Sequence, residues 1–266
     1  MSKSRFKSKN YKMKKFLKVS GYILLALIVL LGAAFFKFNE KQPTGKTGEK
    51  AEALAQKMLQ AVNKPAWDSI GVISWASRAG NKHLWDKKRG LAQVEWKKNK
   101  VLLDINKKTG KAWEKQTPVS DPEKANKLVQ DAYKIFVNDM FWLNPVVKIF
   151  DDGTERSIVT LPDGTEGLMV SYKSGGVTPG DSYVWLLDAN GLPKAWKLWV
   201  KVIPIGGVEI SWDDWVTLPS GAKVSTMHKA KGMSMEIPTL TIKSAKDLAA
   251  YGLSDDPFLP ILLNHD

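Results

Sequence analysis

The sequence of 266 residues contains no cysteine and only three histidines, His83, His228 and His265, which lie far apart. The absence of cysteine excludes disulfides, thiolate metal ligands, a cysteine nucleophile and a lipid-modified cysteine. No H-E-x-x-H motif is present, and no histidine has a second metal ligand at helical spacing. We therefore predict neither a metal site nor a bound cofactor.

Sequence motifs for nucleophilic catalysis are also missing, because the chain has no G-x-S-x-G sequence. The glycine-rich stretch 174–180 has no helix after it that would hold a phosphate. Asp213 and Asp214, framed by Trp212 and Trp215, resemble the carboxylates of a sugar-cleaving site. In a strand, however, adjacent side chains point to opposite faces and do not act on one glycosidic bond. We predict that the protein is not an enzyme, with a carbohydrate-active enzyme as the alternative.

The formal net charge of +13 is concentrated at the N-terminus. Residues 1–18 hold eight lysines and arginines and no acid, so the rest of the chain has 32 basic against 27 acidic residues, or +5. A nucleic-acid-binding surface needs basic groups clustered on the folded part. The excess therefore indicates targeting of the N-terminus, and we predict no nucleic-acid partner.

Residues 19–36, VSGYILLALIVLLGAAFF, contain no charged side chain. A helix of this length rises roughly 27 Å, which is close to the hydrocarbon thickness of a bilayer. We predict a single transmembrane helix in this segment. The alternative is a cleaved signal peptide, since the small residues 32–34 are suited to a cleavage site. The apolar run continues through Phe35 and Phe36, which favours an anchor that is retained.

The basic flank predicts the orientation, because positively charged flanks stay in the cytoplasm. Residues 1–18 are then a cytoplasmic tail, and residues 19–36 cross the bacterial inner (cytoplasmic) membrane once. Residues 37–48 are polar, contain glycine and proline, and predict a short tether. Residues 49–266 form one extracytoplasmic domain, which is periplasmic in a bacterium with two membranes.

Two amphipathic helices are predicted in this domain, at 49–62 and 121–143, because their apolar residues recur on one helical face. Asp121 is suited to the N-cap of the second helix, and Pro122 to its first position, where no N–H group is required. Pro145 disfavours helical conformation in the residue before it and ends the helix. The last turn of this helix, Met-Phe-Trp-Leu at 140–143, is apolar nearly all round.

The remaining segments, 67–116 and 146–243, consist of short β-favouring runs separated by turn residues, which is typical of antiparallel strands. Residues 195–203, AWKLWVKVI, alternate with Trp196, Leu198, Val200 and Val202 on one face, as in a sheet with one buried side. We predict an α+β domain, mainly β, in which one curled antiparallel sheet forms an open half-barrel covered by helices.

Tryptophan is abundant, with eleven residues that fall mostly in predicted strands. Large rings often fill a core, but a curled sheet wider than its own side chains leaves an apolar cavity. We therefore predict a hydrophobic ligand site. Its candidate residues are the apolar helix end and three sheet tryptophans: Met140, Phe141, Trp142, Trp185, Trp196 and Trp212.

The order of elements, with an export or anchor segment, a helix, strands, an inserted helix and more strands, resembles the LolA/LolB/LppX-type envelope proteins. Within that group the chain is most similar to an uncharacterised bacterial envelope family, through DMFWLNP at 139–145, YVWL at 183–186 and WKLW at 196–199. The resemblance covers about residues 45–245. It implies an incomplete β-barrel with a helical lid that holds acyl chains or a lipidated partner.

This chain differs from the proteins of that group in two features. The anchor is predicted to be retained, whereas a soluble carrier is released, and there is no cysteine for the lipid of an outer-membrane receptor. We therefore expect a membrane-anchored protein that binds a lipid, an acyl chain or a lipidated partner. The alternative is a packed structural or interaction module that binds no ligand.

Overall fold

The computed structural model describes residues 18, 20–23, 25, 32, 35, 37–174, 179–232 and 236–263. Most of the predicted anchor at 19–36 lies outside the described residues, as do residues 1–17 of the basic tail and His265. Among the residues that the structure describes, no helix has both the length and the apolar character needed to span a membrane.

The described domain is mainly β with a few helices, as predicted. The helices are α2 (Glu49–Ala61), α3 (Lys64–Asp68), α4 (Pro122–Leu143), the 3-10 helix η1 (Pro145–Lys148), α5 (Leu248–Tyr251) and α6 (Leu259–Leu262). The two long predicted helices are confirmed as α2 and α4. The N-cap of α4 is also as expected, since the Asp121 carboxylate accepts hydrogen bonds from the backbone N–H groups of Glu123 and Lys124, at 2.9 and 3.1 Å.

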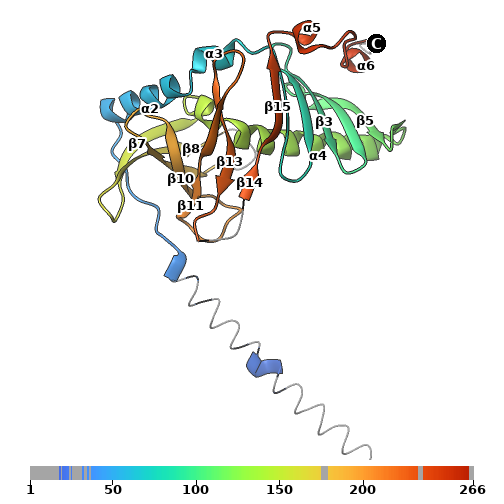
Figure 1. The fold of residues 1–266 in the computed structure, drawn as a ribbon. Coiled ribbons are helices and arrows are strands. Elements are labelled where there is room, and N and C mark those ends of the chain that lie inside the picture. The colour runs from blue at the N-terminus through green and yellow to red at the C-terminus, as the bar shows by residue number, and fades with distance from the viewer. Residues whose placement is uncertain are drawn as a thin grey trace, which may run out of the picture.

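A seven-stranded antiparallel sheet contains the predicted first run of strands. Its members are β1 (Val72–Ala76), β2 (Lys82–Asp86), β3 (Leu91–Trp96), β4 (Asn99–Asp104), β5 (Thr109–Glu114), β6 (Thr117–Pro118) and β15 (Leu240–Ala245). Strands β1 to β6 follow one another as a meander. β15 pairs with β1, with Val72 opposite Ala245, so the last strand in the chain lies beside the first (Figure 1).

The other strands form two smaller antiparallel sheets. The five-stranded sheet contains β7 (Thr154–Thr160), β8 (Glu166–Tyr172), β9 (Ser182–Leu187), β10 (Pro193–Trp199) and β11 (Val208–Ser211). The three-stranded sheet contains β12 (Asp213–Thr217), β13 (Lys223–Lys229) and β14 (Glu236–Pro238).

The strands are therefore divided among three open sheets, where the sequence predicted one. The division occurs at Trp212, where the chain leaves β11 and enters β12 in a different sheet. Asp214, the second residue of β12, has a φ of 50°, which is in the left-handed region. An antiparallel β-bridge between Ile210 and Ala230 links the five-stranded sheet to the three-stranded sheet.

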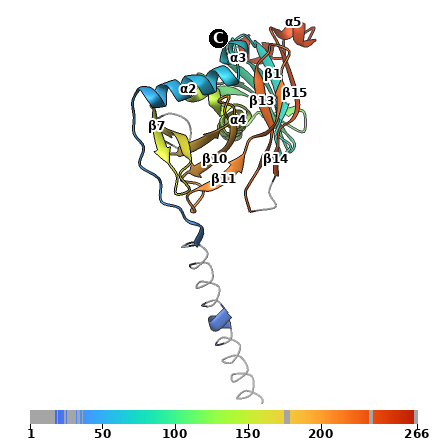
Figure 2. The same ribbon diagram turned by 60° about the vertical axis from the view of Figure 1, so that its left-hand side comes forward.

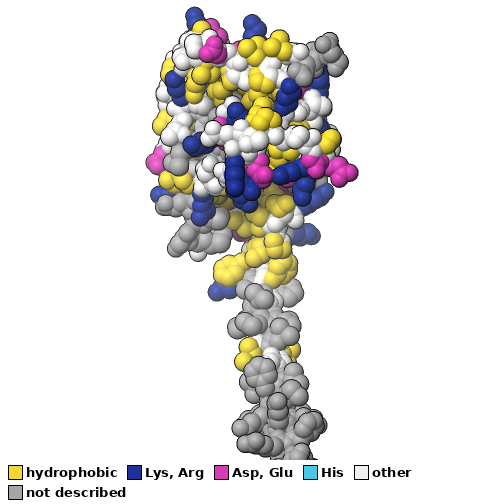
Figure 3. All heavy atoms as spheres, turned by 90° about the vertical axis from the view of Figure 1, so that its right-hand side faces the viewer, with side chains coloured by type: hydrophobic (Ala, Val, Ile, Leu, Met, Phe, Trp, Pro, Cys, Tyr) yellow, Lys and Arg dark blue, Asp and Glu magenta, His cyan; other side chains and the backbone are white. Residues whose placement is uncertain are grey.

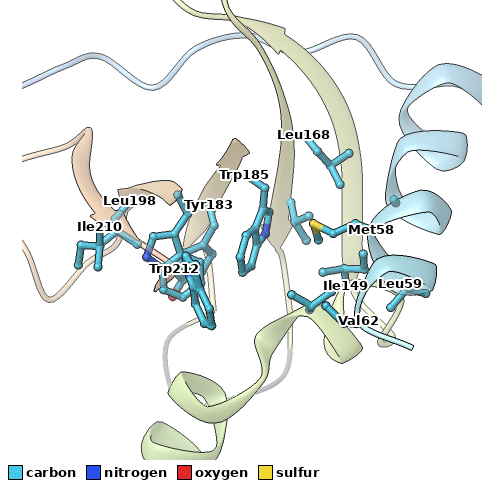
Figure 4. Packing of buried hydrophobic residues seen from close by; sticks show 14 of the residues in the cluster. Met58, Leu59, Val62, Ile149, Leu168, Tyr183, Trp185, Leu198, Ile210 and Trp212 are labelled. Atoms are coloured by element: carbon cyan, nitrogen blue, oxygen red, sulfur yellow. The ribbon is translucent and has the colours of Figure 1, made fainter. Parts of the chain in front are cut away.

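Each large sheet packs its own hydrophobic core. The inner face of the five-stranded sheet, which carries Leu168 and Trp185, packs against α2 and η1 through Met58 and Ile149 (Figure 4). Figures 1 and 2 show α2 lying along this sheet and α4 running from it towards the seven-stranded sheet. The buried face of the seven-stranded sheet packs against α4 through residues such as Phe136.

The alternation predicted along 195–203 holds through β10. Trp196 and Leu198 lie in the core of the inner face. Trp199 packs on the opposite, outer face, in a cluster with Met169 and Val184. Beyond the end of β10, Val202 is 74% exposed, because the chain there has left the sheet.

Candidate ligand cavity

A cavity of about 580 Å³ lies between the C-terminal half of α4 and the inner face of the five-stranded sheet. Its apolar walls come from the helix end and from β8, β9, β10 and the loop that follows β10: Met140, Phe141, Trp142, Tyr172, Tyr183, Trp196, Leu198, Val200, Val202 and Ile203. Pockets that hold small molecules have volumes of roughly 300–1,000 Å³ and mostly apolar walls. The cavity therefore has the size and lining of a small-molecule site.

The apolar last turn of α4 is explained by its position between two cores. Leu143 is 1% exposed and packs in the core of the seven-stranded sheet. Phe141 and Trp142 pack instead against the core of the five-stranded sheet. Residues in one helical turn point in all directions, so a turn held between two sheets needs apolar side chains all round.

An aromatic cluster forms the floor of the cavity, with Trp196 at its centre. The Trp196 ring centroid lies 5.9 Å from that of Phe141 and 5.3 Å from that of Trp142 on the helix. On the sheet it lies 4.6 Å from Tyr183 and 4.7 Å from Trp185. Aromatic pairs at these separations are mutually stabilising, so the helix and the sheet meet through rings in defined positions.

Four of the six predicted ligand residues line the cavity: Met140, Phe141, Trp142 and Trp196. The other two, Trp185 and Trp212, are 0% and 2% exposed and belong to the core behind it. Figure 4 shows Trp185 and Trp212 within this packing, beside Tyr183 and Leu198.

Sequence reasoning missed several lining residues, notably Tyr172, Tyr183 and Leu198. Leu198 was on the predicted buried face of β10, and its partner across the ladder is Tyr183. Tyr183 in turn pairs with Val170 on β8, two residues before Tyr172. The register between neighbouring strands therefore decides which of their residues share the inner face. This register cannot be determined from the sequence alone.

Two hydrogen-bond donors in the cavity wall lack a partner among the described residues. These are the hydroxyl of Tyr172 and the indole N–H of Trp196, and both atoms are buried. Burial raises the pKa of Tyr172 above its usual range, so its hydroxyl keeps its proton at neutral pH. Both donors are closed off from the cavity by neighbouring side chains, so they belong to its packed wall.

The rim of the cavity carries charged side chains of both signs. Lys134 on α4, Lys148 on η1 and Asp151 and Asp152 of the turn after η1 line this rim, and Lys148 forms an ion pair with Asp151. In the described part of the chain, no group of three acids or histidines is arranged to hold a metal ion. The site thus combines an apolar interior with a charged edge.

The carboxylates of Asp213 and Asp214 do not line the cavity. Asp213 accepts a hydrogen bond from the Ser211 hydroxyl at 2.6 Å. The flanking tryptophans are engaged in packing, since Trp212 is buried and the indole N–H of Trp215 donates to the carbonyl oxygens of Pro193 and Trp212. The buried ring of Trp212 is not the open platform that a bound sugar would need.

His228 is a buried histidine beside the aromatic cluster, with its ring 4.2 Å from Trp212 and 5.6 Å from Trp142. Its Nδ1 donates to the Ser211 carbonyl oxygen at 3.2 Å, and its Nε2 has no partner among the described residues. Burial lowers the pKa of His228 to about 4, and the backbone groups of Ser211 and Trp142, together with the Asp213 charge, offset this only in part. The ring is therefore neutral at neutral pH.

This shift predicts acid sensitivity. A histidine whose folded pKa lies below its unfolded value of about 6.5 gives full stability above pH 6.5 and loses it as the pH falls towards 4. We expect the free energy of unfolding to fall by about 3 kcal/mol between pH 7 and pH 4 through this residue. Urea titrations of the full chain in mild detergent measure it. His228→Phe should remove that part of the pH dependence, and an unchanged slope would contradict the assignment.

Comparisons with known proteins give limited likenesses. No protein-family model matches the chain, and no curated protein matches it. A crystal structure of a DUF1329 family protein from Desulfovibrio piger is similar with a TM-score of 0.41 and 13% identity, covering 79% of this chain and 98% of that one. A domain assigned to outer membrane lipoprotein sorting in Vibrio parahaemolyticus has a TM-score of 0.31 and 10% identity, covering 79% and 99%. At these TM-scores the likenesses carry no inference about function.

Proposed function

We propose that the chain is a membrane-anchored, extracytoplasmic protein that binds a lipid, an acyl chain or a lipidated partner in the cavity beside α4. In this proposal residues 19–36 are the anchor in the bacterial inner membrane. The three open sheets act together as a half-barrel with α2 and α4 as its cover. The role is binding and not catalysis.

The observation that carries the proposal is the cavity itself, which stays open between a helix and a sheet that are otherwise closely packed. Its walls are formed by rings and branched aliphatic side chains, which favour methylene groups over water. Burial of each acyl CH₂ group is worth about 0.8 kcal/mol, so a dozen supply roughly 10 kcal/mol before the costs of ordering.

Tryptophan quenching tests the proposal directly, because all eleven tryptophans lie between residues 67 and 215 and none lies in the predicted anchor. The full chain is placed in nanodiscs and titrated with a lysophospholipid whose acyl chain is brominated. Bromine atoms in the cavity would contact Trp142 and Trp196, so we expect saturable quenching in the wild-type protein.

Matched variants separate cavity binding from general adsorption. Val137→Phe with Val200→Phe adds bulk from opposite walls of the cavity and should abolish the saturable quenching. Val216→Phe adds the same bulk on β12, at a residue that is 40% exposed, and should leave it unchanged. Equal quenching in all three proteins, or none in the wild type, would instead favour the packed interaction module.

A further inference from the structure

The segment predicted to be a short tether is bound to the outer face of the five-stranded sheet. The Trp199 indole N–H donates to the Glu40 carbonyl oxygen at 2.8 Å, and the Lys197 ammonium pairs with the Glu40 carboxylate at 2.7 Å. Further along, Lys46 exchanges two backbone hydrogen bonds with Ile158 on β7, at 2.8 and 2.9 Å. Residues 40–46 therefore run across the sheet in a fixed path (Figures 1 and 2).

The N-terminal end of the tether lies beside the β10–β11 loop, residues 200–207. The Glu40 N–H donates to the Gly206 carbonyl oxygen at 3.0 Å, and the Gly206 N–H donates to the Asn39 side-chain oxygen at 2.8 Å. The fit is close, because a Cβ atom on Gly206 or Gly207 would lie 2.6 Å from atoms of Glu40. The chain therefore leaves the folded domain towards residues 19–36 at one defined place, beside this loop.

The same loop forms part of the cavity rim, through Val200, Val202 and Ile203. Its tip reads Val-Ile-Pro-Ile at 202–205, with Val202 74% exposed and Pro204 also exposed. Exposed loops are usually polar, so an apolar tip indicates a contact surface. Phe38, just before the tether, is 60% exposed. Figure 3 shows hydrophobic side chains gathered where the N-terminal segment meets the domain.

Basic side chains surround this apolar tip. Lys37, Lys41 and Lys201 are exposed. Of the acids beside them, Glu40 is paired with Lys197, and Asp181, which accepts a hydrogen bond from the Lys201 backbone N–H at 3.0 Å, is buried. Apolar residues flanked by cations are typical of segments that lie in the headgroup region of a bilayer. A partner protein is the less suitable occupant, because the apolar run 19–36, the predicted anchor, ends only two residues before Phe38.

We infer that the β10–β11 loop rests in the phospholipid bilayer surface and that the cavity takes up its ligand from that bilayer at this edge. The inference rests on the proposed function, because it needs both the anchor and the cavity. It adds the source of the ligand, a lipid of the membrane that holds the anchor, and the route of entry, past Val202 and Ile203. The docked tether acts as a spacer that keeps this edge at the membrane.

The absence of cysteine makes the test simple, since any introduced cysteine is the only thiol. Pro204→Cys and, as the matched control, Val216→Cys are labelled with an environment-sensitive fluorophore in the full chain. Each is reconstituted in phosphatidylcholine–phosphatidylglycerol vesicles with and without nitroxide-bearing lipid. We expect a blue shift and nitroxide quenching at position 204 and neither at 216. Equal, water-like signals at both positions would overturn the inference.

A second variant separates this inference from the proposed function. Pro204 does not line the cavity, so Pro204→Asp should leave binding of soluble brominated lysophospholipid unchanged. Uptake of brominated phosphatidylcholine from the host vesicle should slow about tenfold, which corresponds to a barrier raised by about 1.4 kcal/mol. Unchanged uptake overturns the route at the loop while the cavity still binds. Failure of soluble lysophospholipid to bind the wild type overturns the proposed function itself.

Discussion

Trp196→Ala is expected to lower the free energy of unfolding by about 3–5 kcal/mol, the cost of replacing a fully buried tryptophan with alanine. Trp196 is 0% exposed and contacts rings from α4, from β9 and from the β11–β12 connection. Its removal leaves a void between elements that α2 and η1 hold apart, so the walls have little room to collapse. Denaturant titration of the full chain, followed by circular dichroism, measures the loss.

Trp199→Ala is the matched control, because Trp199 lies on the same strand with its side chain on the outer face. It loses one hydrogen bond to Glu40 and part of a smaller cluster. Its cost should be about 1–2 kcal/mol, since the ring is only partly buried and a neutral hydrogen bond contributes about 1 kcal/mol. If the two variants cost the same, Trp196 is not the centre of the packing between helix and sheet.

The regular elements were predictable because their signals are local. The apolar periodicity of 49–62, and Asp121 with Pro122 at the start of α4, act within a few residues. The alternation of Trp196, Lys197 and Leu198 along β10 is local in the same way. In each case the physical cause lies within one or two turns of chain, so one sequence is enough.

The division into three sheets was not predictable, because it depends on which strands pair across long stretches of sequence. Asp214 adopts a φ of 50°, which aspartate tolerates but which no pattern around it requires. Trp212 and Trp215 both read as strand residues, although the first lies at the turn between sheets. The pairing of β15 with β1 is equally non-local, since it joins Ala245 to Val72.

The apolar character of the candidate site could be predicted from the sequence, but its lining residues could be predicted only in part. An apolar helix end and many tryptophans indicated an apolar site, and Trp142 and Trp196 do line the cavity. Trp185 has the same residue type and the same sheet face, yet it lies deeper, where α2 covers the strand. A cavity is the volume that packing leaves unfilled, so its edge depends on how distant elements are placed.

Asp139→Ala is expected to lower the free energy of unfolding by about 2–5 kcal/mol, because it leaves buried hydrogen-bond donors without their acceptor, at about 1–3 kcal/mol for each. Asp139 lies on α4 and is 8% exposed. Its carboxylate is 2.8 Å from Nε2 of His83 on β2 and accepts hydrogen bonds from Asn81 at 2.9 Å and Asn138 at 3.1 Å. Without Asp139, the buried His83 and the Asn81 amide lose their acceptor.

The pKa of Asp139 fixes the pH range in which this network stabilises the fold. Burial alone raises the pKa of the carboxyl, but the hydrogen bonds from His83 and the two asparagines outweigh burial and bring it below its usual range. An acid with a lowered folded pKa stabilises the protein above its unfolded value of about 3.9, and this contribution is lost as the pH falls through the folded pKa. The measurement at pH 7 therefore captures it in full.

Asp131→Ala, on the same helix, provides the comparison, and it should change stability by less than about 1 kcal/mol because the residue is only half-buried. An equal effect of both variants would show that Asp139 acts only through helix propensity. Asp139→Asn keeps the shape and one acceptor oxygen, so its cost should fall between the two.

The Asp139 network also determines which side chains α4 presents to the cavity. Successive residues on a helix are about 100° apart, so Phe141 lies roughly opposite Asp139. Pairing of Asp139 with β2 of the seven-stranded sheet therefore turns Phe141 towards the five-stranded sheet, where its ring stacks 5.9 Å from Trp196. We expect Asp139→Ala to weaken lysophospholipid quenching even where the protein remains folded, because α4 is then free to rotate. If Asp139→Ala lowers stability but leaves the quenching unchanged, Phe141 and Trp142 hold the helix in place without the Asp139–His83 contact.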